Sequence, residues 1–131
     1  MEKRRLGASD IQVSPIGLGC WQFSQGHGLI GKTWAGVDQD TTATSVRTAR
    51  SGGINWFDTA EAYGNGRSEQ SLSAALLSLG VRPGEAIVAT KWMPFFRTAR
   101  SLGQTIDRRL SCLSPYPIDL HQIHQPFSFS P

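Results

Sequence analysis

A chain of 131 residues is long enough for one domain with a buried core, and 39% hydrophobic and 18% charged residues are typical of a folded rather than a disordered protein. The formal charge of +3 is small, and no basic run alternates with aromatic residues, so we expect no nucleic-acid partner. The two cysteines form neither a disulfide framework nor a metal-binding pair. Without a signal-like or membrane-length apolar run, we expect a cytoplasmic protein.

The amino-terminal part predicts a small hairpin and then a first core strand. Residues 3–6 and 11–13 have the apolar and polar pattern of two short strands joined by a polar turn. Residues 15–21 follow as a strand whose glycines permit close approach of a neighbouring backbone or a ligand.

A glycine-rich stretch comes next and matches a nucleotide-binding motif. Gly26 to Thr33 contains G-x-x-x-x-G-K-[ST], in which Lys32 and Thr33 would contact phosphate and Mg²⁺. The motif requires a strand directly before it and a helix at its end. Neither is predicted here, so an ordinary loop above the end of a strand is favoured over a phosphate site, and we expect no metal centre.

The rest of the chain alternates helices and strands. A helix starts at Asp38 or Asp40 and stops at Gly52–Gly53, and apolar residues every three or four positions predict two more helices. The predicted elements after the first helix are a strand at 54–57, a helix from 68 to 80, a strand at 86–91, a helix at 101–113 and a strand at 118–124. This βαβα order predicts an α/β fold with parallel strands and right-handed crossovers.

Parallel strands bring their carboxyl ends to one rim, and here those ends carry reactive side chains. Trp21, Asp58, Lys91 and His124 end four successive strands, and Tyr63 lies on the loop after Asp58. Each has an ordinary explanation by itself: a capping acid, a solvated lysine, a loop tyrosine or a buried core histidine. Together they favour a proton-transfer site.

The combination has a chemical logic. An ammonium near a phenol stabilises the phenolate, and a carboxylate keeps a partly buried ammonium charged. A neutral imidazole beside the phenol can orient a carbonyl oxygen by hydrogen bonding. Tyr63 would then protonate the oxyanion that forms when hydride attacks a carbonyl, and a nicotinamide cofactor would have to supply that hydride.

At these residues the sequence resembles the aldo-keto reductases from about Lys3 to Pro126. The motifs that carry the resemblance are Gly17–Trp21, the long run Asp58–Glu69, Thr90–Lys91 and Asp119–Pro126. The resemblance implies the first four β/α units of a (β/α)8 TIM barrel behind an amino-terminal β-hairpin. It also implies NADPH and the reduction of an aldehyde or ketone to an alcohol.

The family motifs assign roles to individual residues. Asp58, Tyr63, Lys91 and His124 match the catalytic tetrad, and His124 rather than His121 is the match because it stands two residues before Pro126. The resemblance also implies cofactor contacts from Cys20, Trp21 and Asp58. Tryptophans further suggest an aromatic-lined pocket in which Trp21 and Trp92 would contact the substrate.

The resemblance covers only the amino-terminal half of such a barrel, so we expect one partial domain over residues 1–131 with an atypical tail at 127–131. Two alternatives remain: a nucleotide-binding protein that uses Gly26–Thr33, and a non-catalytic half-barrel. An open barrel would expose its edge strands and apolar residues such as Ile87 or Ala89, together with Ile123, and would favour self-association.

Overall fold

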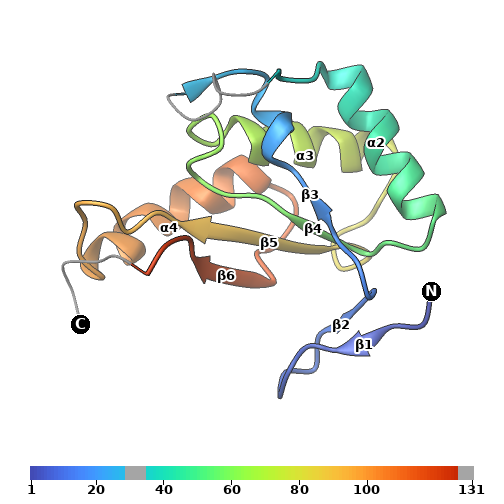
Figure 1. Cartoon of the computed structure of the whole chain (residues 1–131), viewed down its shortest axis with the longest axis horizontal. Coiled ribbons are helices and arrows are strands. Elements are labelled where there is room, and N and C mark those ends of the chain that lie inside the picture. Colours follow the sequence, from blue (N-terminus) through green and yellow to red (C-terminus); the bar gives the residue numbers. More distant parts are fainter. Residues whose placement is uncertain (29–34, 127–131) are drawn as a thin grey trace.

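The computed structural model describes residues 1–28 and 35–126 of the chain (Figure 1). The elements in chain order are β1 (Arg4–Arg5), β2 (Gln12–Val13), β3 (Leu18–Gly19), the 3-10 helix η1 (Trp21–Ser24), α2 (Gln39–Ser51), β4 (Trp56–Asp58), α3 (Arg67–Ser78), β5 (Ile87–Trp92), α4 (Arg100–Leu113) and β6 (Leu120–Ile123). The antiparallel hairpin, β1 with β2, and the alternation that follows it are as predicted.

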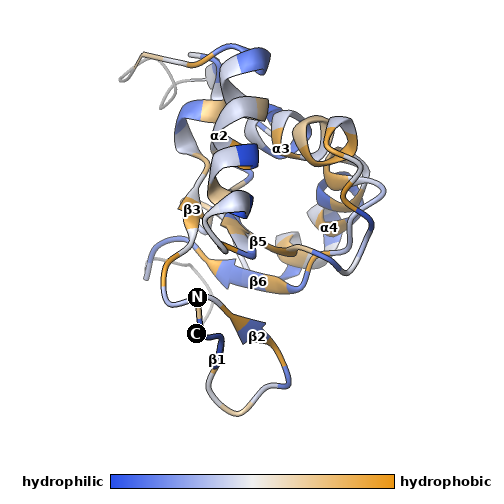
Figure 2. Ribbon diagram, turned by 90° about the vertical axis from the view of Figure 1, so that its right-hand side faces the viewer, coloured by the Kyte–Doolittle hydropathy of each residue, from blue (hydrophilic) through white to orange (hydrophobic). Residues whose placement is uncertain are grey.

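The main sheet contains four parallel strands in the order β3-β4-β5-β6. Its register aligns Gly19 with Asp58, Asp58 with Ala89, and Ala89 with Leu120, so the strands end along one rim. Helices α2, α3 and α4 lie on one side of the curved sheet, and the hairpin lies away from them (Figures 1 and 2). This arrangement is the first four β/α units of a (β/α)8 barrel, which confirms the predicted fold class.

Local chemistry explains where the helices begin. Asp38 is the N-cap of α2, and its Oδ1 accepts a hydrogen bond of 2.7 Å from the backbone N–H of Thr41. Helix α3 follows Gly66, whose φ of +96° favours glycine. A Cβ at Gly66 would also lie only 3.0 Å from Cys112 Sγ on α4, so glycine allows the close approach of these segments.

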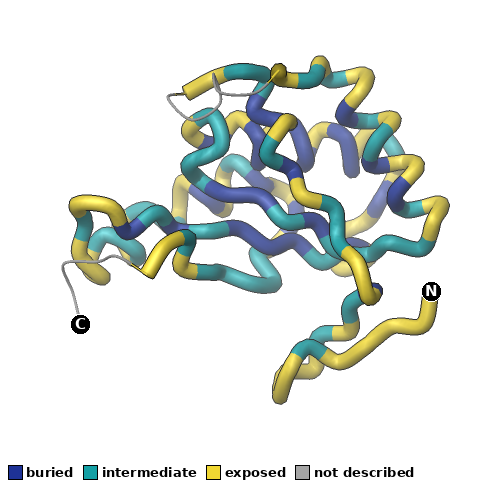
Figure 3. The backbone as a smooth tube through the Cα atoms, viewed as in Figure 1, coloured by how far each residue is buried: buried dark blue, intermediate teal, exposed yellow. Residues whose placement is uncertain are grey.

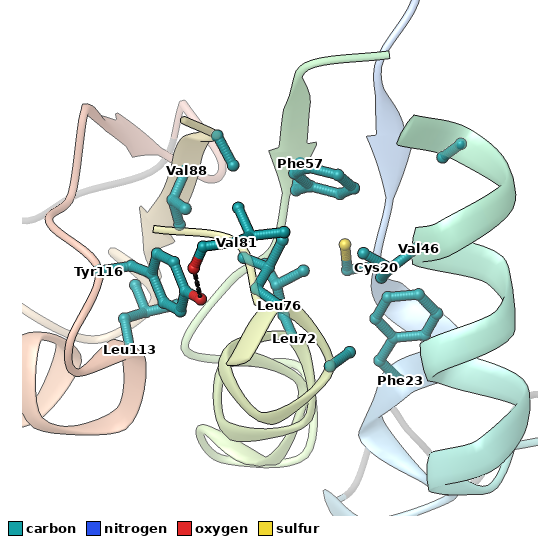
Figure 4. Close-up of a cluster of buried hydrophobic side chains, with 13 residues drawn as sticks. Cys20, Phe23, Val46, Phe57, Leu72, Leu76, Val81, Val88, Leu113 and Tyr116 are labelled. Carbon is teal, nitrogen blue, oxygen red and sulfur yellow. Dashed lines mark hydrogen bonds between the residues drawn. The ribbon is translucent and has the colours of Figure 1, made fainter. Parts of the chain in front are cut away.

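The core lies between the sheet and the helices (Figure 4). Phe57 and Val88 from the strands pack in the same buried cluster as Leu72 and Leu76 of α3. Tyr116 closes one end of the cluster, where its hydroxyl donates a 2.6 Å hydrogen bond to the carbonyl of Val81. The buried stretches follow the strands and the inward faces of the helices, whereas the hairpin is largely exposed (Figure 3).

The first core strand is shorter than predicted. Only Leu18–Gly19 forms β3, whereas residues 15–21 were expected to be extended. The Cys20 N–H still pairs with the Asp58 carbonyl at 2.9 Å, but the Cys20 backbone (φ −108°, ψ 19°) leaves the strand and starts η1. Trp21 therefore lies in a 3-10 turn above the strand end.

The other face of the sheet also differs from expectation. Ala89 is fully buried rather than exposed, and the hairpin residues Leu6 and Val13 line a cavity of about 100 Å³ together with Ile87 and Ala89. Ile123 is 65% exposed, as expected, but its side chain lies on the same face of the sheet as its register partner Trp92, which is the face opposite to Ala89.

No helix in the described part of the chain has the length and apolar character needed to cross a membrane.

Candidate active site

A charged pair forms where β4 and β5 end. Asp58 is the last residue of β4, and Lys91 extends β5 two residues past Ala89, which is the register partner of Asp58. The Lys91 ammonium donates to Asp58 Oδ2 at 2.6 Å and to the carbonyl oxygen of Thr59 at 2.9 Å. The two side chains are 13% and 27% exposed, so the ion pair is only partly screened by water.

Tyr63 lies next to this pair on the loop between β4 and α3. Hydrogen bonds from the Tyr63 N–H to the Ala60 carbonyl and from the Ser68 N–H to the Tyr63 carbonyl, each 3.1 Å, make the loop tight. The centroid of the Tyr63 ring is 5.1 Å from Lys91 Nζ. A cation at this distance from the ring centre makes a cation–π contact with Tyr63.

Two further rings enclose Tyr63. The Trp21 ring is stacked on it, with centroids 5.6 Å apart and planes 6° apart. The His124 ring meets it edge to face, with centroids 5.4 Å apart and planes 86° apart. His124 follows β6, and its N–H continues the sheet pairing by donating to the Trp92 carbonyl at 3.0 Å. The structure thus brings together Trp21, Asp58, Tyr63, Lys91 and His124.

The surroundings of His124 favour the neutral form of its ring by lowering its pKa. Burial of the imidazole lowers its pKa below the ordinary 6.5, and the nearby charge of Lys91 lowers it further, although Asp58 and Glu61 oppose this shift. Its Nδ1 is buried and has no hydrogen-bond partner within residues 1–28 and 35–126. Nδ1 of the His124 ring is therefore a hydrogen-bonding atom that the described residues leave unpaired.

Cys20 does not join these residues. Its side chain is fully buried in the core cluster, and burial strongly raises the pKa of its thiol. Its N–H bonds to Asp58, and its carbonyl accepts from Phe23 N–H at 3.1 Å and from Ser68 Oγ at 2.5 Å. The Cys20 thiol therefore lies away from the rim, and the expected contact between the cofactor and the Cys20 segment stays a prediction.

Trp92 lies on the other face of β5 from Lys91, and its expected contact with the substrate stays a prediction. It follows Lys91 directly, and successive side chains of a strand point to opposite faces. Trp92 is 2% exposed, its Nε1 donates to Ser101 Oγ at 3.2 Å, and the Arg97 guanidinium lies 5.3 Å from the ring centre. Trp92 therefore packs against the α4 side of the sheet.

The phosphate-loop motif Gly26–Thr33 falls largely outside the described residues, since positions 29–34 are not described. Its surroundings differ from those of a phosphate loop. The 3-10 helix η1, rather than a strand, comes before Gly26, and α2 begins only at Gln39, after residues 35–38 that are not helical. No three histidine, cysteine, aspartate or glutamate side chains gather into a metal-binding group in the described parts.

Buried polar residues beneath the site were not predicted from the sequence. Glu69 accepts a 2.7 Å hydrogen bond from Thr90 Oγ1, beside Lys91 in β5. Arg109 Nη1 of α4 lies 2.9 Å from Glu69 Oε2, an ion pair without hydrogen-bond geometry, and burial raises the pKa of Glu69 to about 7. The only sequence signal was the Ser68–Glu69 pair at the start of a predicted helix.

The site has a place for a further group. Asp58 Oδ1 is buried and lacks a hydrogen-bond partner in the described parts of the chain. Gly19, the register partner of Asp58, has no atom within 4 Å of the position that a Cβ would take. The rim thus has an unused carboxylate acceptor on β4 and open space at the paired residue of β3. Chemically, the rim offers a phenol donor, an ammonium beside it and a neutral imidazole.

The parallel β/α units and the reactive side chains at the carboxyl ends of their strands identify the chain as part of a (β/α)8 barrel of the enzyme type. The model of the Aldo/keto reductase family matches residues 15–131. The chain belongs to the aldo-keto reductase family, as its motifs indicated.

Individual relatives agree with this assignment. The aldo-keto reductase YhdN of Bacillus subtilis is 34% identical over 134 residues, which cover 96% of this chain and 38% of the relative. The glycerol dehydrogenase AKR11B4 of Gluconobacter oxydans is similar in structure, with a TM-score of 0.75 and 30% identity over 96% of this chain and 40% of the other. An aldo-keto reductase of Klebsiella pneumoniae, solved in complex with NADPH, has a TM-score of 0.73 at 21% identity and is covered to 40%. The chain thus spans well under half the length of these relatives.

Proposed function

We propose that this chain carries the catalytic side chains of an NADPH-dependent carbonyl reductase that converts an aldehyde or ketone into an alcohol. The single observation that carries the proposal is the cluster in which Lys91 Nζ is 2.6 Å from Asp58 and 5.1 Å from the Tyr63 ring, with His124 edge-on to that ring. The NADPH named with the Klebsiella pneumoniae relative supports this choice of cofactor.

Each residue has one task in the proposed reaction. Tyr63 donates its phenolic proton to the carbonyl oxygen as negative charge develops there. Lys91 stabilises the phenolate left behind, and Asp58 holds the Lys91 ammonium in position. The neutral His124 donates a hydrogen bond that orients the carbonyl. Trp21 covers one face of the Tyr63 ring and restricts access of water to it.

The cofactor would lie next to the strand ends. NADPH, when bound, supplies the hydride for the carbonyl carbon. Asp58 Oδ1 and the open space at Gly19 fit the amide-bearing nicotinamide ring, and Trp21 flanks the same place. We further propose that residues from the part of the barrel that this chain does not span hold the rest of the cofactor.

The test uses a chimaera of YhdN in which residues 1–126 of this chain replace the corresponding part of the relative. In that protein, Tyr63→Phe should lower the rate of NADPH-dependent aldehyde reduction by roughly 10²- to 10⁴-fold, because it removes the proton donor. The dissociation constant of NADPH, followed by its fluorescence, should barely change.

Tyr116→Phe is the matched control, since the protein has only two tyrosines and Tyr116 is a buried one whose hydroxyl bonds to Val81. Its turnover should remain near that of the parent. Near-parental turnover of Tyr63→Phe would overturn the proposed role of Tyr63.

A further inference from the structure

Ser68, at the start of α3, connects the segments that carry the site. The residue is fully buried, and its Oγ donates to the Cys20 carbonyl at 2.5 Å. Its Oγ also lies 2.8 Å from Thr59 Oγ1. Since a serine hydroxyl has one proton, and that proton goes to Cys20, the Thr59 hydroxyl must donate to Ser68. The hydrogen bonds therefore run in one direction, from Thr59 through Ser68 to Cys20.

Each partner of Ser68 holds a different member of the rim. The Cys20 carbonyl also accepts the Phe23 N–H at 3.1 Å and so opens the 3-10 turn that presents Trp21. The Thr59 carbonyl is the second acceptor of the Lys91 ammonium. The Ser68 N–H itself donates to the carbonyl of Tyr63 at 3.1 Å. One small residue thus restrains the backbones next to Trp21, Tyr63 and the acceptor of Lys91.

We propose that Ser68 is a positioning residue that sets the stacking of Trp21 on Tyr63 and the placement of Lys91 beside the phenol. The inference rests on the proposed function of the tetrad, but its main test does not require activity. Removing the hydroxyl by Ser68→Ala would leave Thr59 without its acceptor and would release the Cys20 carbonyl from α3. The parallel rings, now 5.6 Å apart, would then change their relative position.

The alternative is that Ser68 only contributes stability, like any buried hydroxyl. Ser73 provides the matched control, because it lies in the same helix, is 4% exposed and donates from Oγ to the Ser114 carbonyl at 2.7 Å. Ser73→Ala removes the same kind of hydrogen bond at a place remote from the rim. Ser68→Ala loses two side-chain hydrogen bonds and Ser73→Ala loses one, so the variants are compared by the Tyr63 signals of the folded protein and not by their stability.

The two tyrosines make the measurement specific. In the 131-residue chain labelled with ¹³C-tyrosine, Tyr63 senses the ring current of Trp21, whereas Tyr116 lies two residues after Ser114. Ser68→Ala should shift the Tyr63 ring signals and leave those of Tyr116 in place. Ser73→Ala should do the reverse. Unchanged Tyr63 signals in folded Ser68→Ala, or equal shifts of both tyrosines, would overturn the proposal.

If Ser68→Ala does not fold, Thr59→Val takes its place, because it is nearly isosteric and removes only the hydroxyl that donates to Ser68. Tyr63 signals should again shift, and their constancy would count against the proposal. In the YhdN chimaera, Ser68→Ala should lower kcat roughly 10- to 100-fold through misplacement, with little change in KM. An active Tyr63→Phe chimaera would refute the proposed function. The NMR result tests the positioning role of Ser68 independently of that function.

Discussion

Replacing Lys91 by methionine would leave Asp58 without its ammonium partner in a site that is mostly closed to water. Lys91 donates to Asp58 Oδ2 at 2.6 Å and to the Thr59 carbonyl at 2.9 Å, and both hydrogen bonds would be lost. The other carboxylate oxygen of Asp58 already lacks a partner among the described residues, so the carboxylate would have no hydrogen bond from them. We therefore expect Lys91→Met to destabilise the folded state.

The size of the effect follows from the exposure of the pair. Hydrogen bonds to charged groups contribute about 1.5–3 kcal/mol each, and the 27% exposure of Asp58 places the total for the two bonds near the low end, at about 3 kcal/mol. With an unfolding entropy of about 2.1 cal/mol/K per residue, a chain of 131 residues should lose roughly 11 °C in Tm. The loss should be visible in both thermal and urea unfolding.

The assay is a double-mutant cycle by urea unfolding, followed by circular dichroism at pH 7. Asp58→Asn should cost less than Lys91→Met, since an amide is neutral, and the double variant should be more stable than the sum of the single effects predicts. Arg82→Met is a control that breaks the exposed pair with Glu85 and should leave the unfolding midpoint unchanged. Additive effects of Lys91→Met and Asp58→Asn, within about 0.5 kcal/mol, would refute the energetic coupling inferred from the geometry.

Four further predictions concern other parts of the molecule. An NMR titration should place the pKa of His124 below 6.5, and Lys91→Met should raise that pKa. Because the pKa is lowered in the folded state, His124 should make the protein less stable as the pH falls through 6.5. A measured pKa at or above 6.5 would contradict the argument from burial. Gly17→Ala should cost about 1–3 kcal/mol, since its Cβ would lie 2.2 Å from the Trp56 ring, whereas Gly19→Ala meets no atom within 4 Å; equal unfolding midpoints would be inconsistent with this packing. Because β3 and β6 form the edges of the described sheet, light scattering should show self-association of the 131-residue chain, which should also lack NADPH-dependent reductase activity; an active, monodisperse monomer would disprove this expectation. Calorimetry should detect no saturable binding of Mg²⁺-ATP at millimolar concentration, and binding that Lys32→Ala abolishes would restore the phosphate-loop interpretation.

The sequence by itself determined the order of elements and the family. Helix spacing, the Asp38 cap and the glycines after α2 and α3 are local signals, so they could be interpreted without a partner in space. Parallel pairing then placed Asp58, Lys91 and His124 at one rim, because strands connected by helices end on the same side. The motif Asp58–Glu69 supplied Tyr63.

Only the tertiary structure decided which neighbours in sequence share the site. Lys91 and Trp92 are adjacent, yet the pleat of β5 sends Lys91 to the rim and buries Trp92 against α4. The Cys20 backbone bonds to Asp58 and Ser68, and its thiol lies in the core rather than at the rim. Such outcomes depend on register and on contacts between residues far apart in the chain, such as Ser68 with Cys20, which no local pattern encodes.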